Sequence, residues 1–349
     1  MARRDSREVV YPISVEPPLP VAEVVDVLDG RIRGSFAETL RPVATGFSPL
    51  DEYMSGGFHA EDLVLVGGIQ GVGKTVAILQ MARAAALQGR LGIVVCYEHS
   101  PIHLLFRLLC MESFWNREES RLTWPALRDA MLGLGEDPQR SFDRLLIRLP
   151  AAREAWSRLS QYMEGIWLVP GDGVHTTVDV LDMFVADALA RGYESPVLFV
   201  DYVQIVPVRP DPMGVLPVDK ERISVVMKAL KATAIRHRAI VVAVAAADEQ
   251  ALRRQRVHLE NLWGPSLMQY QPDTAIVLNR GSASAAGEGP TMIRFGLEKQ
   301  RNGPQGIEFE FALHGAHFCF ASQGRLVPAE KSFQQERVRL RRGESKSEN

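Results

Sequence analysis

Cysteine is scarce in this sequence, and its spacing carries no recognisable motif. The chain has 3 cysteines in 349 residues. Cys96, Cys110 and Cys319 lie far apart in apolar stretches, without a CxxC pair or a Cys/His ligand spacing. This pattern excludes a disulfide-stapled fold and a structural zinc site, so we expect reduced cysteines in a hydrophobic core.

A strong charge of one sign is also missing. The chain has 40 Lys+Arg against 42 Asp+Glu, for a formal net charge of -2. This balance excludes a basic field that would draw the whole molecule onto nucleic acid. Any contact with DNA or RNA must therefore be local.

Long apolar runs are absent as well. No run approaches the length of a membrane-spanning helix, and the polar, proline-rich residues 1–19 lack the apolar core of a secretory signal. The composition, with 46% hydrophobic and 23% charged residues, is that of a globular protein. We expect a cytoplasmic protein without a membrane partner.

Both ends of the chain differ from its middle. Residues 1–44 are interpreted as an N-terminal arm and linker helix, because Val21–Arg33 repeats apolar residues at helical spacing, with an interruption expected at Gly30. Residues 323–349 are highly charged and are predicted to be disordered; their arginines could touch nucleic acid, but a solvated tail is the favoured interpretation.

Residues 45–322 alternate short apolar runs with longer helical segments, which predicts an α/β domain with a mostly parallel sheet and helices on both faces. Residues 117–161 carry apolar residues among many arginines and predict a helical insertion, either a cover over the sheet or a surface for a protein partner. The parallel strands are expected at Leu63–Val66, Gly92–Tyr97, Ile166–Val169, Val197–Val200, Ala239–Ala245 and Thr274–Leu278. An antiparallel C-terminal extension is expected from Thr291–Glu298, Ile307–Leu313 and His317–Phe320.

The most informative motif is a glycine-rich turn at Gly68–Thr75, which matches GxxxxGK[ST] between a predicted strand and a predicted helix. Glycines let backbone N–H groups converge on one anion, and the positive end of the following helix adds to this attraction. The sequence therefore predicts a phosphate-binding loop for ATP, with Lys74 reaching the β- and γ-phosphates and the Thr75 hydroxyl binding Mg²⁺. The predicted nucleotide-contacting residues are Gly68, Gln70, Gly71, Val72, Gly73, Lys74, Thr75 and Val76. The alternative is a strand-to-helix turn that binds nothing.

Two acidic residues follow buried strands. Asp201 ends Val197–Val200, and the carboxyl ends of parallel strands meet at one edge, so Asp201 is predicted to hold Mg²⁺ beside Thr75. Glu98 follows the strand after the loop helix and is a candidate general base for the attacking water. From the residues alone, a helix-capping acid is an equally good interpretation of Glu98.

Several further motifs, taken in order, resemble the ATPase domain of DnaB-type replicative helicases, a RecA-like P-loop family. They are Thr45–Asp51 with Gly56 and Gly57, Tyr97–Ser100, Arg107–Cys110, Asp201–Gln204, Lys228–Lys231 and Lys299–Pro304. The resemblance covers about residues 45–320. Asp201–Gln204 is similar to the family's DYLQ signature, and Gln204 is counted with the nucleotide-binding residues.

This resemblance implies a homo-oligomeric ring, commonly hexameric, with ATP at the seams between subunits and single-stranded DNA as a partner. In such rings the segment Lys299–Pro304 serves the nucleotide of the neighbour, so Lys299 and Arg301 are expected to act in trans, Arg301 as an arginine finger. The helix at Val21–Arg33 would pack on an adjacent subunit. A solvated basic hairpin is the alternative interpretation of Lys299 and Arg301.

The sequence also departs from this family. Ala245–Ala247 stands where a γ-phosphate-sensing Gln is usual, Pro207–Pro217 is apolar where a polar DNA loop is usual, and Trp263 stands near an expected Arg. Trp263 could stack on a base, plug a ring or dock a partner. No segment resembles the helical N-terminal domain of this family, so we expect a motor domain with a linker.

Two functions are therefore compared. The first is a helicase or translocase driven by ATP. The second is an ATP-gated ring that recruits protein partners, through residues 117–161 or the arm, without unwinding DNA. A small-molecule kinase is a third interpretation, but the sequence offers no recognisable acceptor site for it.

Overall fold

The structure is a computed structural model, and it describes residues 18–33, 39–135, 139–210, 213–248, 250–251, 254, 256–281 and 289–328. The chain divides into two compact units, Met1–Arg41 and Pro42–Asn349. The second unit begins slightly before the predicted boundary at residue 45, because Val43 is buried and forms an antiparallel bridge with Phe58.

The first unit contains helix α1 (Val21–Ile32), whose apolar residues are exposed. The helix runs through Gly30, so the interruption predicted there is wrong. An exposed glycine inside a helix costs only about 1 kcal/mol relative to alanine, which one turn of neighbouring hydrogen bonds can offset. Arg33 closes the end of the helix with an ion pair to Asp29 at 2.5 Å.

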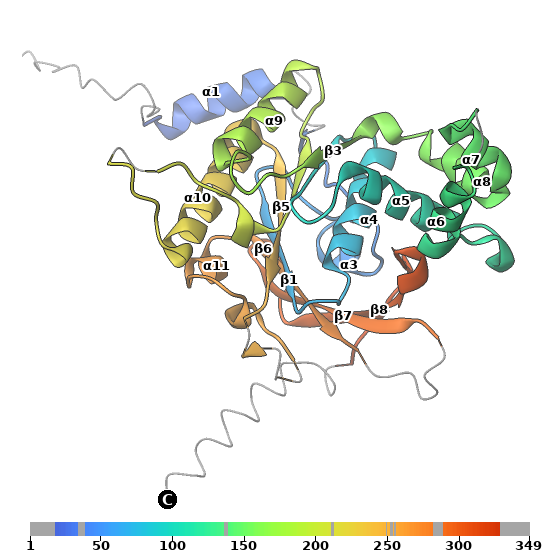
Figure 1. The fold of residues 1–349 in the computed structure, drawn as a ribbon. Coiled ribbons are helices and arrows are strands. Elements are labelled where there is room, and N and C mark those ends of the chain that lie inside the picture. The colour runs from blue at the N-terminus through green and yellow to red at the C-terminus, as the bar shows by residue number, and fades with distance from the viewer. Residues whose placement is uncertain are drawn as a thin grey trace, which may run out of the picture. The chain divides into compact units, whose positions relative to one another are not determined.

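The second unit is built on one twisted sheet, which has ten strands within the described residues (Figure 1). Strands β6, β1, β5, β4, β2 and β3 are parallel neighbours in that order, and β7, β8, β9 and β10 extend the β6 side in antiparallel fashion. The strands are β1 (Leu63–Gly68), β2 (Gly92–Cys96), β3 (Ile166–Pro170), β4 (Val197–Asp201), β5 (Ile240–Ala246), β6 (Thr274–Arg280), β7 (Thr291–Gln300), β8 (Ile307–His314), β9 (Cys319–Phe320) and β10 (Arg325–Leu326).

Helices cover both faces of the sheet, with α4 and α5 on one side and α9 and α10 on the other (Figure 1). The α-helices of this unit are α3 (Leu50–Tyr53), α4 (Lys74–Leu87), α5 (Pro101–Ser113), α6 (Trp124–Leu132), α7 (Phe142–Arg148), α8 (Pro150–Leu159), α9 (Val178–Ala190), α10 (Asp219–His237) and α11 (Leu267–Tyr270). Short 3-10 turns are η1 (Glu118–Ser120), η2 (Met163–Gly165), η3 (Val203–Ile205), η5 (Leu259–Asn261) and η6 (Gly315–His317).

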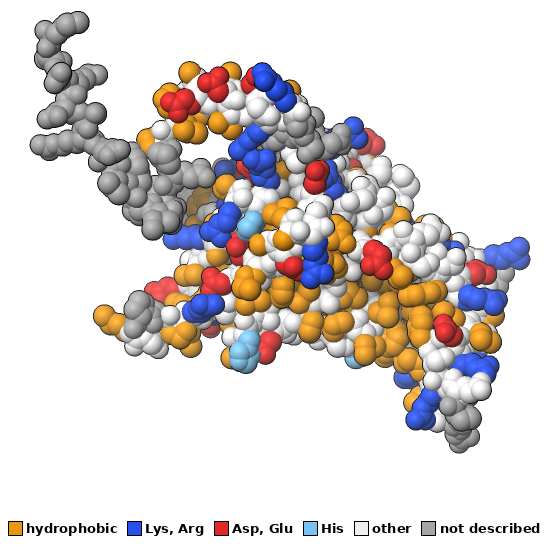
Figure 2. Space-filling view, turned by 90° about the horizontal axis from the view of Figure 1, so that it is seen from above, with side chains coloured by type: hydrophobic (Ala, Val, Ile, Leu, Met, Phe, Trp, Pro, Cys, Tyr) orange, Lys and Arg blue, Asp and Glu red, His pale blue; other side chains and the backbone are white. Residues whose placement is uncertain are grey.

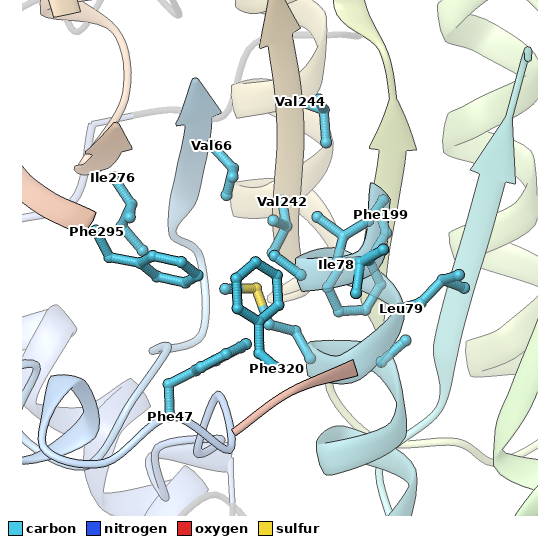
Figure 3. Packing of buried hydrophobic residues seen from close by; sticks show 14 of the residues in the cluster. Phe47, Val66, Ile78, Leu79, Phe199, Val242, Val244, Ile276, Phe295 and Phe320 are labelled. Carbon is cyan, nitrogen blue, oxygen red and sulfur yellow. The ribbon is translucent and has the colours of Figure 1, made fainter. Parts of the chain in front are cut away.

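The two-residue period of the strands sorts the core into two layers. In β1, Val64 and Val66 face the α4 side, while Leu63 and Leu65 face the α10 side. Figure 3 shows the α4 layer, where Val66 and the ring of Phe320 lie beside the buried residues of α4. The strands are apolar on both faces because both faces are covered, as expected for a parallel sheet.

The helical insertion predicted at 117–161 is present as η1, α6, α7 and α8. It is joined to the loop helix α4 through Glu112, whose side chain is fully buried and forms an ion pair with Arg83. Tyr162 donates to the same carboxylate, and the Arg158 guanidinium donates to the Glu112 carbonyl at 2.8 and 3.1 Å. The insertion is therefore fixed against α4 by a satisfied polar cluster.

The predicted strands all appear, with ends shifted by a residue or two. One expectation is wrong: the predicted tail, residues 323–349, begins as structure. Arg325–Leu326 forms β10 on β8, and Val327 N–H donates to Glu308 O at 2.8 Å. The ion pair of Arg325 with the buried Glu310 explains why this charged segment is ordered. Residues 329–349, with the tail arginines, lie outside the described residues.

The described part of the chain contains no helix long and apolar enough to cross a membrane. Its cysteines Cys96, Cys110 and Cys319 are free and buried, as predicted.

Candidate nucleotide-binding site

The glycine-rich turn lies between β1 and α4, at the carboxyl edge of the parallel strands. Gly68, Gly71 and Gly73 have φ angles of 151°, 79° and 89°, which L side chains rarely adopt. A Cβ on Gly68 would lie 2.6 Å from Leu278 O, and one on Gly73 would lie 2.9 Å from the Phe320 ring. These glycines let the backbone turn tightly at the start of a helix of 14 residues, where backbone N–H groups and the positive end of the helix favour an anion.

The side chains of this loop divide between solvent and core. Gln70 and Gly71 lie at its exposed tip. Val72 and Val76 are buried in the α4 layer of the core, so only their backbone groups are free to meet a ligand. The core thus anchors the loop while its polar backbone remains available.

Lys74 begins α4 and folds back over the loop. Its ammonium donates to Gly68 O at 3.0 Å and to Ile69 O at 2.9 Å. Burial lowers the pKa of Lys74, and the nearby carboxylates of Asp201 and Glu98 oppose this effect. The Lys74 ammonium therefore lies inside the turn, and the negative charges of Asp201 and Glu98 act on it.

Thr75 and Asp201 meet directly beneath the turn. The Thr75 hydroxyl donates to Asp201 Oδ2 at 2.7 Å, across the gap between α4 and β4. Asp201 is only 2% exposed, and this burial raises its pKa; the Thr75 hydrogen bond and the cations Lys74 and Arg107 act in the opposite direction. The structure thus brings the two predicted Mg²⁺ ligands into contact.

Glu98 lies two residues beyond the end of β2, in the bend that leads to α5. The strand was expected to continue to Tyr97 but ends at Cys96. Glu98 is exposed, and its charge acts on both Asp201 and Lys74. Ser100, rather than Glu98, caps α5 through its hydroxyl, which accepts from His103 N–H. The capping role considered for Glu98 is therefore filled by another residue.

Sequence reasoning assigned no role to Arg107, which the fold places beside these acids. Arg107 projects from α5, hydrogen-bonds His99 Nε2 at 2.8 Å and lies 5.1 Å from the Phe318 ring. Burial lowers its pKa, while Asp201 and Glu98 are among the charges that raise it. No sequence spacing signals this placement, because it depends on which side chains meet across the fold.

Gln204 was predicted to bind nucleotide, and in the structure its amide makes hydrogen bonds within the chain. It is buried in η3, donates to Ala246 O at 3.2 Å and Trp263 O at 2.9 Å, and accepts from Ala246 N–H at 3.2 Å. The next amide, Ala247 N–H, donates to Gly68 O at 3.2 Å. Gln204 therefore links the ends of β4 and β5 next to the loop.

Lys299 and Arg301 lie at the opposite edge of the sheet from the glycine-rich turn. Val64 pairs with Thr274 and Gly68 pairs with Leu278, while Thr274 is opposite Gln300. At about 3.3 Å per residue, the four steps from Val64 to Gly68 alone separate the two edges by about 13 Å. The structure does not bring these two cations to the loop of their own chain.

At that far edge both cations are held by carbonyl groups. Lys299 Nζ donates to Gln269 O at 2.9 Å and to Tyr270 O at 2.7 Å, and Arg301 reaches Tyr270 O at 3.3 Å. They are ordered groups at the end of β7 rather than freely solvated ends.

Trp263 is partly buried and packs against the α10 layer of the core. Its backbone N–H donates to Ala246 O at 2.9 Å. These contacts favour a packing role for the ring over stacking on a base. In the apolar segment at Pro207–Pro217, the side chains of Met213, Val215 and Leu216 are exposed.

This donor set fits ATP with Mg²⁺. A Mg²⁺ ion bound to a nucleotide needs few protein ligands, because phosphate oxygens and water supply the others. The Thr75 hydroxyl and the Asp201 carboxylate are two such oxygens at one place. Among the described residues, no group of three or more His, Cys, Asp or Glu could hold a metal ion by itself.

A glycine loop between strand and helix, a lysine within it, and an acid at the end of a neighbouring parallel strand define a P-loop nucleotide-binding domain with a RecA-like arrangement. Known proteins refine this class. Residues 42–138 match the family model for the DnaB-like helicase C terminal domain. Over this segment the chain is therefore similar to a DnaB-type helicase domain.

Curated relatives agree with this assignment. The chain is 25% identical to the replicative DNA helicase DnaB of Treponema pallidum over 310 residues, which is 86% of this chain and 61% of that protein. It is 29% identical to the DnaB helicase of Geobacillus stearothermophilus over 194 residues, 50% of this chain and 41% of that protein. The chain thus spans less than two thirds of the length of either relative.

Solved structures show the same fold. One of them, an isolated ATPase domain, superposes with a TM-score of 0.67 at 18% identity, covering 87% of this chain and 99% of that one. A DnaB-like replicative helicase, described with its interactions with primase, has a TM-score of 0.61 at 19% identity, covering 88% of this chain and 67% of that one.

Proposed function

We propose that this chain hydrolyses ATP at the seams of a ring of identical subunits and uses the energy to translocate on single-stranded DNA or to unwind it. The two curated relatives are replicative DNA helicases, and the chain shares their ATPase domain type. A hexamer in the cytoplasm is the expected assembly. The recruitment ring is not favoured, since the relatives and structural neighbours point to a helicase motor.

The observation that carries the proposal is the contact between Thr75 and Asp201 beneath the glycine-rich turn. A hydroxyl and a buried carboxylate from distant parts of the chain meet at 2.7 Å where a bound triphosphate would place its metal. A turn that binds nothing would have no need to bury an acid there, because burial disfavours its charged form.

The residues around the turn suggest separate tasks. Thr75 and Asp201 would hold Mg²⁺, which supplies positive charge to the phosphates when it is bound. Lys74, leaving the carbonyls of Gly68 and Ile69, would donate to the β- and γ-phosphates. Glu98, exposed at the rim, would orient the attacking water and accept its proton.

Lys299 and Arg301 complete the site from a neighbouring subunit. Their position at the far edge of their own sheet supports an action in trans, because they cannot reach the loop of their own chain. Arg301 would stabilise charge on the transferring phosphoryl group, and Lys299 would add a second cation.

DNA contact must be local. On the face shown in Figure 2, Lys and Arg side chains are scattered among acids, and apolar side chains cover a broad area. We place the DNA on the inner loops of the ring rather than on an outer basic surface, with residues 117–161 as a surface for a protein partner.

Hydrolysis assays with and without single-stranded DNA test the proposal. We expect DNA to stimulate hydrolysis, with a stimulation that weakens as salt rises. Lys74→Ala should lose nucleotide affinity, whereas Glu98→Gln should bind ATP and fail to cleave it. Glu118→Gln, an exposed acid of η1, is the matched control and should behave as the unmodified chain. Normal turnover by Glu98→Gln would show that the assigned base is wrong, and the absence of any DNA effect would contradict the motor.

A further inference from the structure

The far edge of the sheet has its own buried acid. Asp273 lies immediately before β6 and is 7% exposed. Its Oδ2 accepts from Leu63 N–H at 2.8 Å and from Lys231 Nζ at 2.7 Å. Leu63 begins β1, the strand that leads directly into the phosphate-binding loop, and Lys231 belongs to α10.

The second oxygen of Asp273 serves a different partner. Asp273 Oδ1 lies 3.3 Å from Arg301 Nε, and Asp273 O accepts from Arg301 N–H at 3.0 Å. The Arg301 side chain is 53% exposed, so without an anchor it would sample many rotamers. Fixing such a side chain in advance removes part of the entropic cost of ordering it when it must act.

We propose that Asp273 is a positioning residue for the trans-acting arginine. It holds Arg301 at the subunit seam, aimed at the nucleotide of the neighbour, and ties that arginine to the strand that carries the phosphate-binding loop of its own chain. The proposal rests on the proposed function, because it takes Arg301 as the cation that acts in trans.

The two carboxylate oxygens of Asp273 have different partners, so a variant can remove the contact with Arg301 and keep the contacts that stabilise the fold. Asn at this position keeps an oxygen for Leu63 N–H and Lys231 and presents an amide N–H₂ where Arg301 now finds an acceptor. Asp273→Asn should therefore loosen Arg301 while β1 stays in place. A displacement of about 1 Å at a catalytic group can cost on the order of 100-fold in rate.

Variants measured alone give the first test. Asp273→Asn should lower kcat for hydrolysis by about 10- to 100-fold and leave the affinity for a fluorescent ATP analogue within about twofold. Lys231→Met is the matched control, since it removes the other charge partner of Asp273 and leaves Arg301 anchored. It should lower the melting temperature and keep kcat within about twofold.

Mixed rings give the decisive test. Lys74→Ala subunits have a disabled loop but an intact Arg301, so mixing them with Arg301→Ala subunits should restore hydrolysis at about one seam in four, by random placement around a ring. Lys74→Ala mixed with Asp273→Asn should recover to a similar level. Asp273→Asn mixed with Arg301→Ala should stay inactive, since neither supplies a positioned arginine.

The outcomes separate two failures. If Lys74→Ala and Arg301→Ala subunits form mixed rings without recovery, the trans arrangement in the proposed function is wrong, and this inference falls with it. If that pair recovers while Lys74→Ala with Asp273→Asn does not, Asp273 acts within its own subunit and the positioning role is overturned. Unchanged kcat in Asp273→Asn, or an equal loss in Lys231→Met, would overturn it too. If Asp273→Asn does not fold, we would use the double variant Asp273→Asn with Lys231→Met, which removes both charges of the pair. This double variant would then replace Asp273→Asn in the mixed-ring experiments.

Discussion

Two buried aspartates stand at opposite edges of the same sheet, and their surroundings differ. Asp201, at the phosphate edge, meets the Thr75 hydroxyl, and burial raises its pKa. Asp273, at the far edge, meets a backbone N–H, a lysine and an arginine. An acid surrounded by partners stabilises the fold, whereas an acid buried beside few of them is held ready for a ligand. The comparison teaches where stability and function lie in this domain.

Asp201→Asn should show the largest effect. We expect hydrolysis to fall on the order of 1,000-fold, because the variant removes the carboxylate that we propose as a Mg²⁺ ligand. The melting temperature should rise at neutral pH, because the variant removes a buried carboxylate whose charged form the fold disfavours. A raised pKa means that this penalty is present above the folded pKa and disappears in acid, so the gain should fade as the pH falls. Thermal scans across pH measure this change in melting temperature. A lower melting temperature for Asp201→Asn at neutral pH would contradict the difference proposed between Asp201 and Asp273.

Asp273→Ala should lower the stability of the fold, which is the opposite of the effect expected for Asp201→Asn. Removing the acid leaves Lys231 and Leu63 N–H without their partner, which should cost about 3–5 kcal/mol of unfolding free energy. Denaturant titration measures this loss. Asp219→Ala, which breaks the more exposed pair with Arg222, is the control and should cost less than about 1 kcal/mol. Equal losses of unfolding free energy in Asp273→Ala and Asp219→Ala would contradict the stabilising role of the buried Asp273.

Gln204→Met should have an intermediate effect. It leaves Ala246 and Trp263 backbone groups without the amide that joins them, at a cost of about 1–3 kcal/mol in stability. Affinity for ATP should be unchanged if the amide works as a link between strands. Gln161→Met, on the surface, controls for the change of side chain. A selective loss of ATP affinity in Gln204→Met would instead support a direct nucleotide contact.

Asp62→Asn should give the smallest effect. Burial and the neighbouring Asp273 raise the pKa of Asp62 from 3.8 to about 6, so its charge is unfavourable in the folded chain. The penalty is fully present above about pH 6 and vanishes below pH 3.8. The variant should be more stable by about 1 kcal/mol above pH 6, with the gain fading toward pH 4. Thermal scans across this pH range measure the gain, and a gain that does not change with pH would contradict the prediction.

Most of the fold could be predicted because it depends on local patterns. Apolar runs flanked by turns located every long strand, and the glycine turn located the phosphate edge. The misses arose where tertiary contacts override composition: Arg325–Leu326 joins the sheet through a buried acid on β8, and Gly30 stays inside a helix.

Some residues of the site could be predicted from the sequence and others could not. Lys74, Thr75 and Asp201 follow from spacing, and the structure brings them together. The bonds of Gln204 and the position of Arg107 depend on which side chains meet across the fold, and no spacing encodes that. Asp273 gave no signal at all, since an aspartate before a strand is commonplace in sequence.

The last glycine of the phosphate-binding loop rests on a ring from the far end of the domain. Gly73 approaches Phe320 so closely that a methyl group would not fit, and Gln80 of α4 exchanges hydrogen bonds with the Phe320 backbone at 2.9 and 3.1 Å. The antiparallel extension thus supports the helix at whose start we propose that the phosphates bind. A chain truncated before Cys319 would keep every loop residue and still lack the support that shapes them.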